Sequence, residues 1–158
     1  MPPMDTTSTV GIVKALRAHL LAFDPPGAQG PASAVLGERL YLTPPDTLAY
    51  PYGLIRLMGR NVTPWLPGER ETADLEVMLH ERPRRLLERL EGIADAFDQA
   101  MQRYTAADAG HTLGIVFSRV RRRDTLPPFS NPADRDVAQI RLVYPLTIWP
   151  GFLFNNAP

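Results

Sequence analysis

The sequence predicts an α+β domain, with a mainly antiparallel sheet of four to five strands and two helices packed on one face. The order of the patterns carries this prediction. A helical stripe comes first, three strand-like runs follow, a second helical stripe comes next, and two strand-like runs close the chain. Adjacent strands joined by short links are typical of antiparallel sheets, whereas parallel sheets alternate strand and helix.

The composition is that of one folded domain. The chain has 158 residues, of which 44% are hydrophobic and 22% are charged. We therefore expect residues 1–158 to form a single domain, with 150–158 as a C-terminal tail. Basic and acidic residues balance at 17 each, so no net field draws the chain to DNA or acidic lipid. Cysteine is absent, which excludes disulfides and thiolate metal sites, and no apolar run is long enough to predict membrane contact.

The chain opens with an amphipathic helix over residues 10–23. Hydroxyl residues at positions 6–9 can cap its start, and Asp24-Pro25-Pro26-Gly27 ends it. Charged residues inside this stretch favour a helix of the folded domain over a signal peptide. Residues 24–38 are then expected to form a loop. The apolar positions of the helix recur at helical spacing: Val10, Val13, Leu16, Leu20 and Phe23.

Three strand-like runs follow this loop. Residues 39–43 form a short one, and residues 52–59 form a second that is apolar on both faces, which predicts a central position in the sheet. Tyr50-Pro51, just before the second run, is a candidate for a cis peptide bond, although the trans form is the more common.

The third run spans residues 70–80, where apolar and polar side chains alternate as in a half-buried strand. Residues 60–69, between the second and third runs, are expected to form a hairpin loop with Trp65 near its tip. The inward-facing positions of the third run are Ala73, Leu75, Val77 and Leu79.

A second helix is predicted over residues 83–104. Pro83 suits its first turn, and Gly110 is a candidate for its C-cap. One helix face packed on a sheet is favoured over a coiled coil, because the stripe is short. That stripe consists of Leu86, Leu90, Ile93, Phe97, Met101 and Tyr104.

Two strands close the domain, over residues 112–123 and 137–149, with residues 124–136 as a long link. Pro145 lies inside the last strand and cannot donate a hydrogen bond to a neighbouring strand. Its presence predicts an edge strand or a bulge.

No assembled catalytic site can be identified. The three histidines, His19, His80 and His111, lie in different elements and lack the spacing of metal ligands. Asp134 and Asp136 are more typical of a solvated turn than of a divalent cation site. Phosphate-binding loops and nucleophile elbows are also missing from the sequence. We therefore expect a protein that is not an enzyme and that needs no cofactor or metal.

The strongest charge feature is a run of arginines near residue 120. In an extended strand Arg119, Arg121 and Arg123 share one face, and Arg122 points to the other. Three like charges on one face need water or acidic partners. The run is therefore either a strand end in water, or a docking patch for an acidic partner surface or for DNA passing through a pore.

Aromatic residues in the long loops provide a second group of candidate contacts. Protein interfaces favour such side chains, and these are Tyr50, Tyr52, Trp65 and Phe129. The C-terminal segment adds Phe152 and Phe154. That segment either folds back over an open edge of its own core or docks on a neighbouring copy.

Four stretches together resemble the tail-terminator (tail-completion) proteins of long-tailed bacteriophages and related tail-like particles, over roughly residues 8–150. They are VGIVKALRAHLLAF, then YPYGLIRL, then ADLEVMLHE with PRRLLERLEGIADAF, and finally IRLVYPLTIW after an Arg-rich strand. The 124–136 link and the Phe-Leu-Phe tail depart from the family pattern.

The resemblance implies a subunit of a six-membered ring that caps the head-proximal end of the tail tube and stops its polymerisation. The implied partners are further copies of the chain, the tail tube protein and the head-tail connector or neck protein, with DNA passing through the pore. The resemblance also implies that the protein is located in the tail or neck of a virion, which is assembled in the host cytoplasm. The family has no catalytic residues to carry over.

Other readings of the sequence remain open. A neck or head-completion adaptor of the same particle is the nearest alternative. A small-molecule-binding α+β domain belongs to a different class and would need a concave apolar pocket with convergent polar groups. A DNA-contacting accessory protein would use the arginine run.

Overall fold

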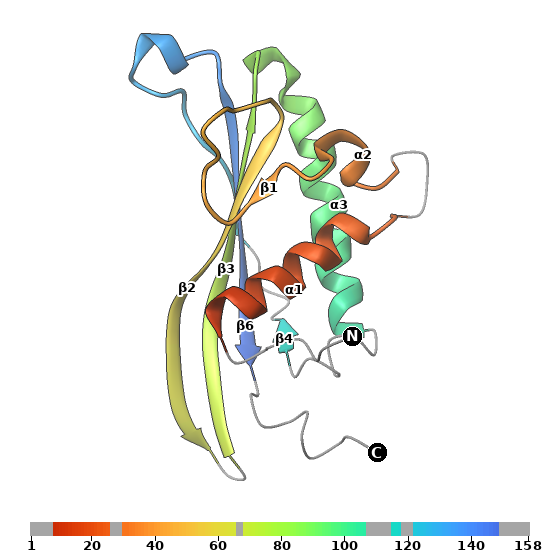
Figure 1. The fold of residues 1–158 in the computed structure, drawn as a ribbon, viewed down its shortest axis with the longest axis vertical. Coiled ribbons are helices and arrows are strands. Elements are labelled where there is room, and N and C mark those ends of the chain that lie inside the picture. The colour runs from red at the N-terminus through yellow and green to blue at the C-terminus, as the bar shows by residue number, and fades with distance from the viewer. Residues whose placement is uncertain (1–7, 26–29, 66–67, 107–114, 118–121, 149–158) are drawn as a thin grey trace.

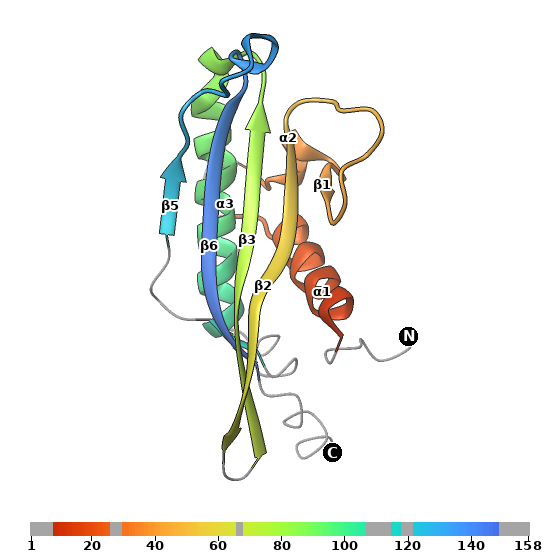
Figure 2. The same cartoon turned by 90° about the vertical axis from the view of Figure 1, so that its left-hand side faces the viewer.

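The computed structural model describes residues 8–25, 30–65, 68–106, 115–117 and 122–148. Within these ranges the chain is an α+β domain, as predicted, with a mixed sheet and its two long helices on one face (Figures 1 and 2). The helical elements are α1 (Thr9–Ala22), α2 (Ser33–Leu36), the 3-10 turn η1 (Arg84–Leu86), α3 (Leu87–Ala106) and the 3-10 turn η2 (Pro132–Asp134). The strands are β1 (Leu40–Tyr41), β2 (Tyr52–Trp65), β3 (Gly68–Glu81), β4 (Ile115–Phe117), β5 (Arg122–Thr125) and β6 (Ala138–Ile148).

The sheet has six strands in the order β1-β2-β3-β6-β4, and β5 also pairs with β6. Only the β1–β2 pair is parallel; the pairs among the other described strands are antiparallel. The strand expected over 112–123 is represented by two segments, β4 and β5, which pair with successive parts of β6. This division is why the sheet has one strand more than the sequence pattern predicts.

Helix α1 begins where the hydroxyl residues predict it. The Ser8 side chain accepts a hydrogen bond from the Gly11 amide at 3.0 Å and so caps the helix. Its buried face includes Val13, Leu16 and Leu20, as expected. Val10, however, is 53% exposed, and the prediction that it joins the core is wrong. The core is instead reached two residues later, at the fully buried Ile12.

Helix α3 confirms the predicted apolar stripe, because Leu90, Ile93, Phe97 and Met101 are all buried against the sheet and α1. The turn η1 precedes it and leaves Leu86 only partly buried. The two long helices are also joined by a polar contact, since His19 Nε2 lies 2.7 Å from the Ala100 carbonyl oxygen. Gly110 lies outside the described residues.

The expected 60–69 loop is wrong, because both strands continue through most of it. Strand β2 runs to Trp65 and β3 starts at Gly68, forming a long hairpin that extends beyond the helices (Figure 2). Two apparent strand breakers are accommodated. Gly59 has a φ of +63° beside a register shift between Met58 and Asn61, which glycine allows at low cost. Pro64 lies on the edge of β2 that β1 does not cover, where no donor is required.

The prediction that the second run is central in the sheet holds only at the start of that run, where β2 lies between β1 and β3. Strands β3 and β6 are internal, whereas β1 covers β2 only at Gly53 and Leu54. The apolar composition of β2 has another cause. A Cβ at Gly53 would lie 2.8 Å from Leu40 Cδ1, which shows how closely β1 packs there. The other face of β2 places Leu54 beside the segment that follows β1.

Pro145 does not mark an edge strand, because β6 lies between β3 and the β4–β5 pair. It occupies the interval between the part of β6 that pairs with β5 and the part that pairs with β4. The 24–38 segment, expected to be a loop, contains the short helix α2. The candidate bond Tyr50-Pro51 is cis, and so is Arg82-Pro83.

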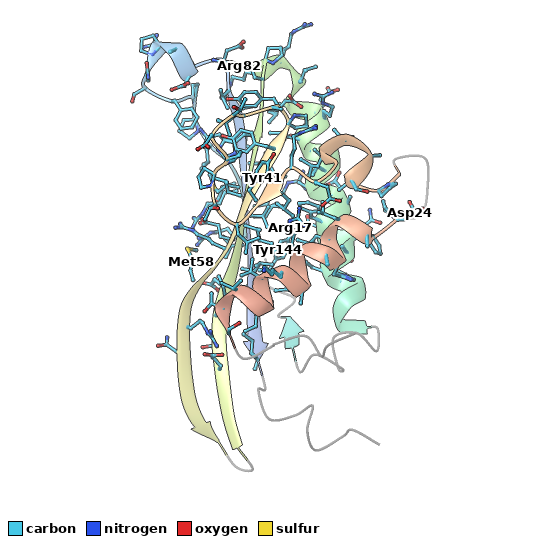
Figure 3. All side chains as sticks on the ribbon, viewed as in Figure 1. Arg17, Asp24, Tyr41, Met58, Arg82 and Tyr144 are labelled. Carbon is cyan, nitrogen blue, oxygen red and sulfur yellow. The ribbon has the colours of Figure 1, made fainter. Side chains whose placement is uncertain are left out.

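The hydroxyl of Tyr144 anchors β6 to α3, because it donates a 2.6 Å hydrogen bond to Asp98 Oδ1 in the core. Tyr144 points from the sheet towards the helices in Figure 3. Tyr144→Phe should lower the free energy of unfolding by about 1–2 kcal/mol, since a buried acceptor loses a donor. Urea denaturation measures this change. Tyr41→Phe, at a partly exposed tyrosine, is the matched control and should shift stability by less than about 0.5 kcal/mol; equal losses in both variants would contradict the assignment.

Candidate interaction surface

The sheet face opposite the helices is the candidate interaction surface, and it is called the outer face below. It faces the viewer in Figure 2, and no described helix covers it. Residues paired across antiparallel strands share a face. Three such rows cross the outer face: Tyr52, His80 and Gln139; Leu54, Met78 and Arg141; and Arg56, Glu76 and Val143.

Glu76 is the centre of a three-residue ion-pair cluster on this face. Arg56 Nε and Arg141 Nε each donate a 2.7 Å hydrogen bond to one of its carboxylate oxygens. Burial alone would raise the pKa of Glu76, but the hydrogen bonds and charges of the two arginines outweigh it and hold that pKa below its usual value. The Arg56 side chain is 65% exposed, so the cluster presents a guanidinium group to solvent.

An open hollow of about 540 Å³ lies beside this cluster. Its apolar lining comes from three segments: Leu42 and Pro44 after β1, Leu54 and Ile55 in β2, and Met78 in β3. Arg56 and Arg141 lie at its border together with Glu76. The outer face therefore combines an apolar depression with oriented cationic groups, a combination that suits a protein contact.

The predicted contact residue Tyr52 is buried within this chain. Its ring stacks on His80 with centroids 4.5 Å apart and planes 8° apart. Burial raises the pKa of Tyr52 to about 12, with Tyr50 and Asp134 adding smaller electrostatic effects. Tyr50 is only partly buried and lies under the Arg82 guanidinium, 5.8 Å from its ring centroid. Of the two tyrosines, Tyr50 is the one available to a partner.

The arginines of the predicted run do not form one patch, because Arg122 and Arg123 point to opposite sides of the sheet. Arg119 and Arg121 lie outside the described residues. Arg123 points to the helix side, where its Nη1 lies 2.6 Å from Asp95 Oδ1 and 3.6 Å from Asp98 Oδ2. Arg122 points to the outer face, is 60% exposed and lies 3.5 Å from Asp124. Arg123 is thus an internal link between β5 and α3, and of these two described arginines Arg122 is the one that a partner can reach.

The remaining predicted contacts lie at opposite ends of the molecule. Phe129 is 40% exposed in the segment between β5 and β6, and Arg82 ties that segment to the sheet through the Ala133 carbonyl oxygen at 2.6 Å. Trp65 ends β2 in the hairpin. Phe152 and Phe154 lie outside the described residues.

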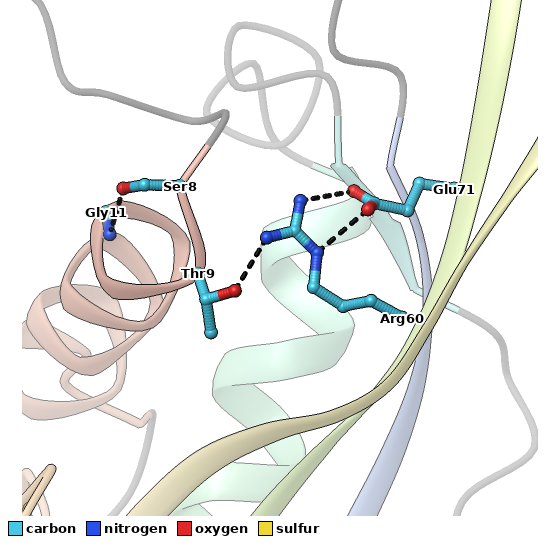
Figure 4. Close-up of polar contacts among 5 residues, drawn as sticks. All are labelled: Ser8, Thr9, Gly11, Arg60 and Glu71. Atoms are coloured by element: carbon cyan, nitrogen blue, oxygen red, sulfur yellow. Dashed lines mark hydrogen bonds and ion pairs between the residues drawn. The ribbon is translucent and has the colours of Figure 1, made fainter.

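Sequence reasoning missed the polar groups that the strand register brings together. Arg60 donates two hydrogen bonds to buried Glu71, at 2.8 and 2.7 Å, and a third to Thr9 Oγ1 at 2.6 Å (Figure 4). This contact fixes the base of the hairpin to the start of α1. The Glu76 cluster was missed for the same reason, because alternation alone assigned Glu76 to solvent. The sequence does contain a signal for this cluster: residues of opposite charge occur at positions that fall on the same face of three strands.

Among the described residues, no three or more acidic or histidine side chains are grouped so that they could hold a metal ion. The described helices also include none that is long and apolar enough to cross a membrane.

Comparisons with known proteins show the fold. Neither the family models nor the curated proteins give a match. Among solved structures, a chain from the virion of a native gene transfer agent particle superposes with a TM-score of 0.62 and 18% sequence identity. The match covers 90% of this chain and 98% of that one, so the two chains share one fold along nearly their whole lengths.

Proposed function

We propose that this protein is a structural subunit of a phage-like tail. In this proposal six copies of the chain form a ring that caps the head-proximal end of the tail tube, stops its polymerisation and joins the tail to the head connector. The observation that carries the proposal is the shared fold with a gene transfer agent virion chain over 90% of this sequence. The sequence resemblance to tail-terminator proteins supports it independently.

The described surface is consistent with such a role. A ring needs two different and complementary patches on each subunit. The outer face provides one candidate, with its hollow and its exposed Arg56. The hairpin and the segment carrying Phe129 provide others at the two ends of the sheet. Glu76 is already paired with two arginines, which favours a contact surface over a catalytic carboxylate.

Electron microscopy and mass photometry of the purified chain test the proposal. Closed rings of one stoichiometry, which then bind the ends of tail tubes, are the expected result. A chain that stays monomeric at every concentration and does not bind tube ends would contradict it.

A neck or head-completion adaptor is the second candidate, because the matched structure is a whole virion and so supports either position in the particle. Binding assays with purified tube protein and purified connector separate the two. The tail-terminating role requires binding to the tube, whereas an adaptor should bind the connector or portal side alone.

A further inference from the structure

We propose that the hollow on the outer face receives the apolar segment Phe152-Leu153-Phe154 of a second copy of this chain. This inference rests on the proposed ring and names one of its contacts. The occupant is a segment of the chain itself, and the argument depends on the chemistry of the hollow, the charge at its border and the length of chain between β6 and the segment.

The hollow has the size and the lining for aromatic side chains. Its volume of about 540 Å³ falls within the roughly 300–1,000 Å³ of pockets that bind small ligands. Leu54 and Met78 form the floor on the sheet, and both are partly exposed in the single chain. Leu42 and Pro44 form a wall. Burying two phenylalanine rings there would remove apolar surface on both partners from water.

The border of the hollow can bind the faces of aromatic side chains. Arg56 and Arg141 are oriented by Glu76, and oriented guanidinium groups stack well on aromatic faces. Residues 150–158, PGFLFNNAP, contain two phenylalanines and no charged side chain.

When fully extended, the segment of the same copy could span the distance to the border of the hollow at Glu76, but it is too short to reach the floor at Met78. Met78 pairs with Arg141, and β6 continues for seven more residues to Ile148, a distance of about 23 Å at 3.3 Å per residue. Phe154 follows Ile148 by six residues, which span at most about 21 Å when fully extended. A chain that must also reverse direction reaches less far. The occupant is therefore a second copy, and insertion of one surface into a different one can propagate around a ring.

Two variants test the contact. Each lacks one of its two surfaces and is called half-defective below. Phe152→Ser/Phe154→Ser removes the inserted segment, and Met78→Glu places a charge in the floor, where Arg141 lies opposite and helps the strand to tolerate it. The matched controls are Asn155→Ser/Asn156→Ser, just after the segment, and Met58→Lys, on the outer face but outside the lining of the hollow. The lysine would lie opposite Asp74, as the glutamate of Met78→Glu lies opposite Arg141, so each introduced charge has an opposite charge across the strand pair. Figure 3 shows Met58 pointing away from the helices.

Mass photometry should find rings for the wild type and both controls, and monomers for each half-defective variant. An equimolar mixture of the two variants retains one intact segment and one intact hollow, so it should form dimers and nothing larger. Thermal melting of each variant shows that it is folded.

Each other outcome contradicts a defined part of the proposal. Rings formed by the segment variant, or by the Met78→Glu variant, would contradict the contact while leaving the ring itself supported. A mixture that stays monomeric would also contradict the contact. A wild type that forms dimers with exchanged segments would support the contact and contradict the ring, whereas a strictly monomeric wild type would contradict both.

Discussion

Arg60→Met should lower the free energy of unfolding by about 3 kcal/mol, because it leaves the carboxylate of Glu71 buried without its charged partner. Glu71 is 4% exposed, and both of its carboxylate oxygens accept hydrogen bonds from Arg60. The same arginine donates a hydrogen bond to Thr9 at the start of α1, so its loss also removes this contact between the hairpin and the helix. Urea denaturation of the purified variant measures the change.

The double variant Arg60→Met/Glu71→Leu is the informative control. Removing both charges replaces a buried ion pair with apolar side chains, which is often close to neutral. The double variant should therefore recover most of the lost stability. Similar losses in the single and double variants would show that packing of the arginine stem, rather than the ion pair, accounts for the effect.

Acidification should destabilise the fold through His80. Burial lowers the pKa of His80 to about 4, against about 6.5 in the unfolded chain. The folded state thus binds the proton less readily, and stability falls as the pH drops from about 6.5 to about 4. Below that range the loss from this group is complete. A shift of this size corresponds to about 3 kcal/mol.

The comparison of wild type with His80→Phe isolates this effect from the carboxylates that titrate at the same pH. Phenylalanine can keep the stack on Tyr52, although it loses the hydrogen bond of the His80 side chain with the Met78 backbone. Unfolding free energies at pH 7 and pH 4 give the pH-dependent loss for each protein. The loss should be about 3 kcal/mol smaller in the variant; identical pH dependence in the two proteins would rule His80 out as its source.

The elements that were predicted correctly are those with a strong local period. Helix α3 follows its stripe because Leu90, Ile93, Phe97 and Met101 face the core one turn apart. Strand β3 follows its alternation through Ala73, Leu75, Val77 and Leu79, which are all buried. In both elements the core-facing positions are set by the backbone geometry of the element itself.

The errors arose where distant parts of the chain decide the outcome. Residues 60–69 contain Pro64 and lie beside Gly59, which locally favours a loop, but the unpaired edge of β2 and the bulge near Gly59 allow the strands to continue. Pro145 could be placed only once β4 and β5 were seen to divide the edge of β6. The Glu76 cluster joins residues from three strands, so no local pattern contains it.

The internal strands also have a mechanical consequence. Strands β3 and β6 pair without interruption from Glu71–Ile148 to Glu81–Ala138, between the hairpin at one end of the sheet and the Phe129 segment at the other. Tension applied between those two ends would shear this ladder along its length and strain its hydrogen bonds together, instead of opening them one after another. The sheet is therefore built to resist a pull along its length.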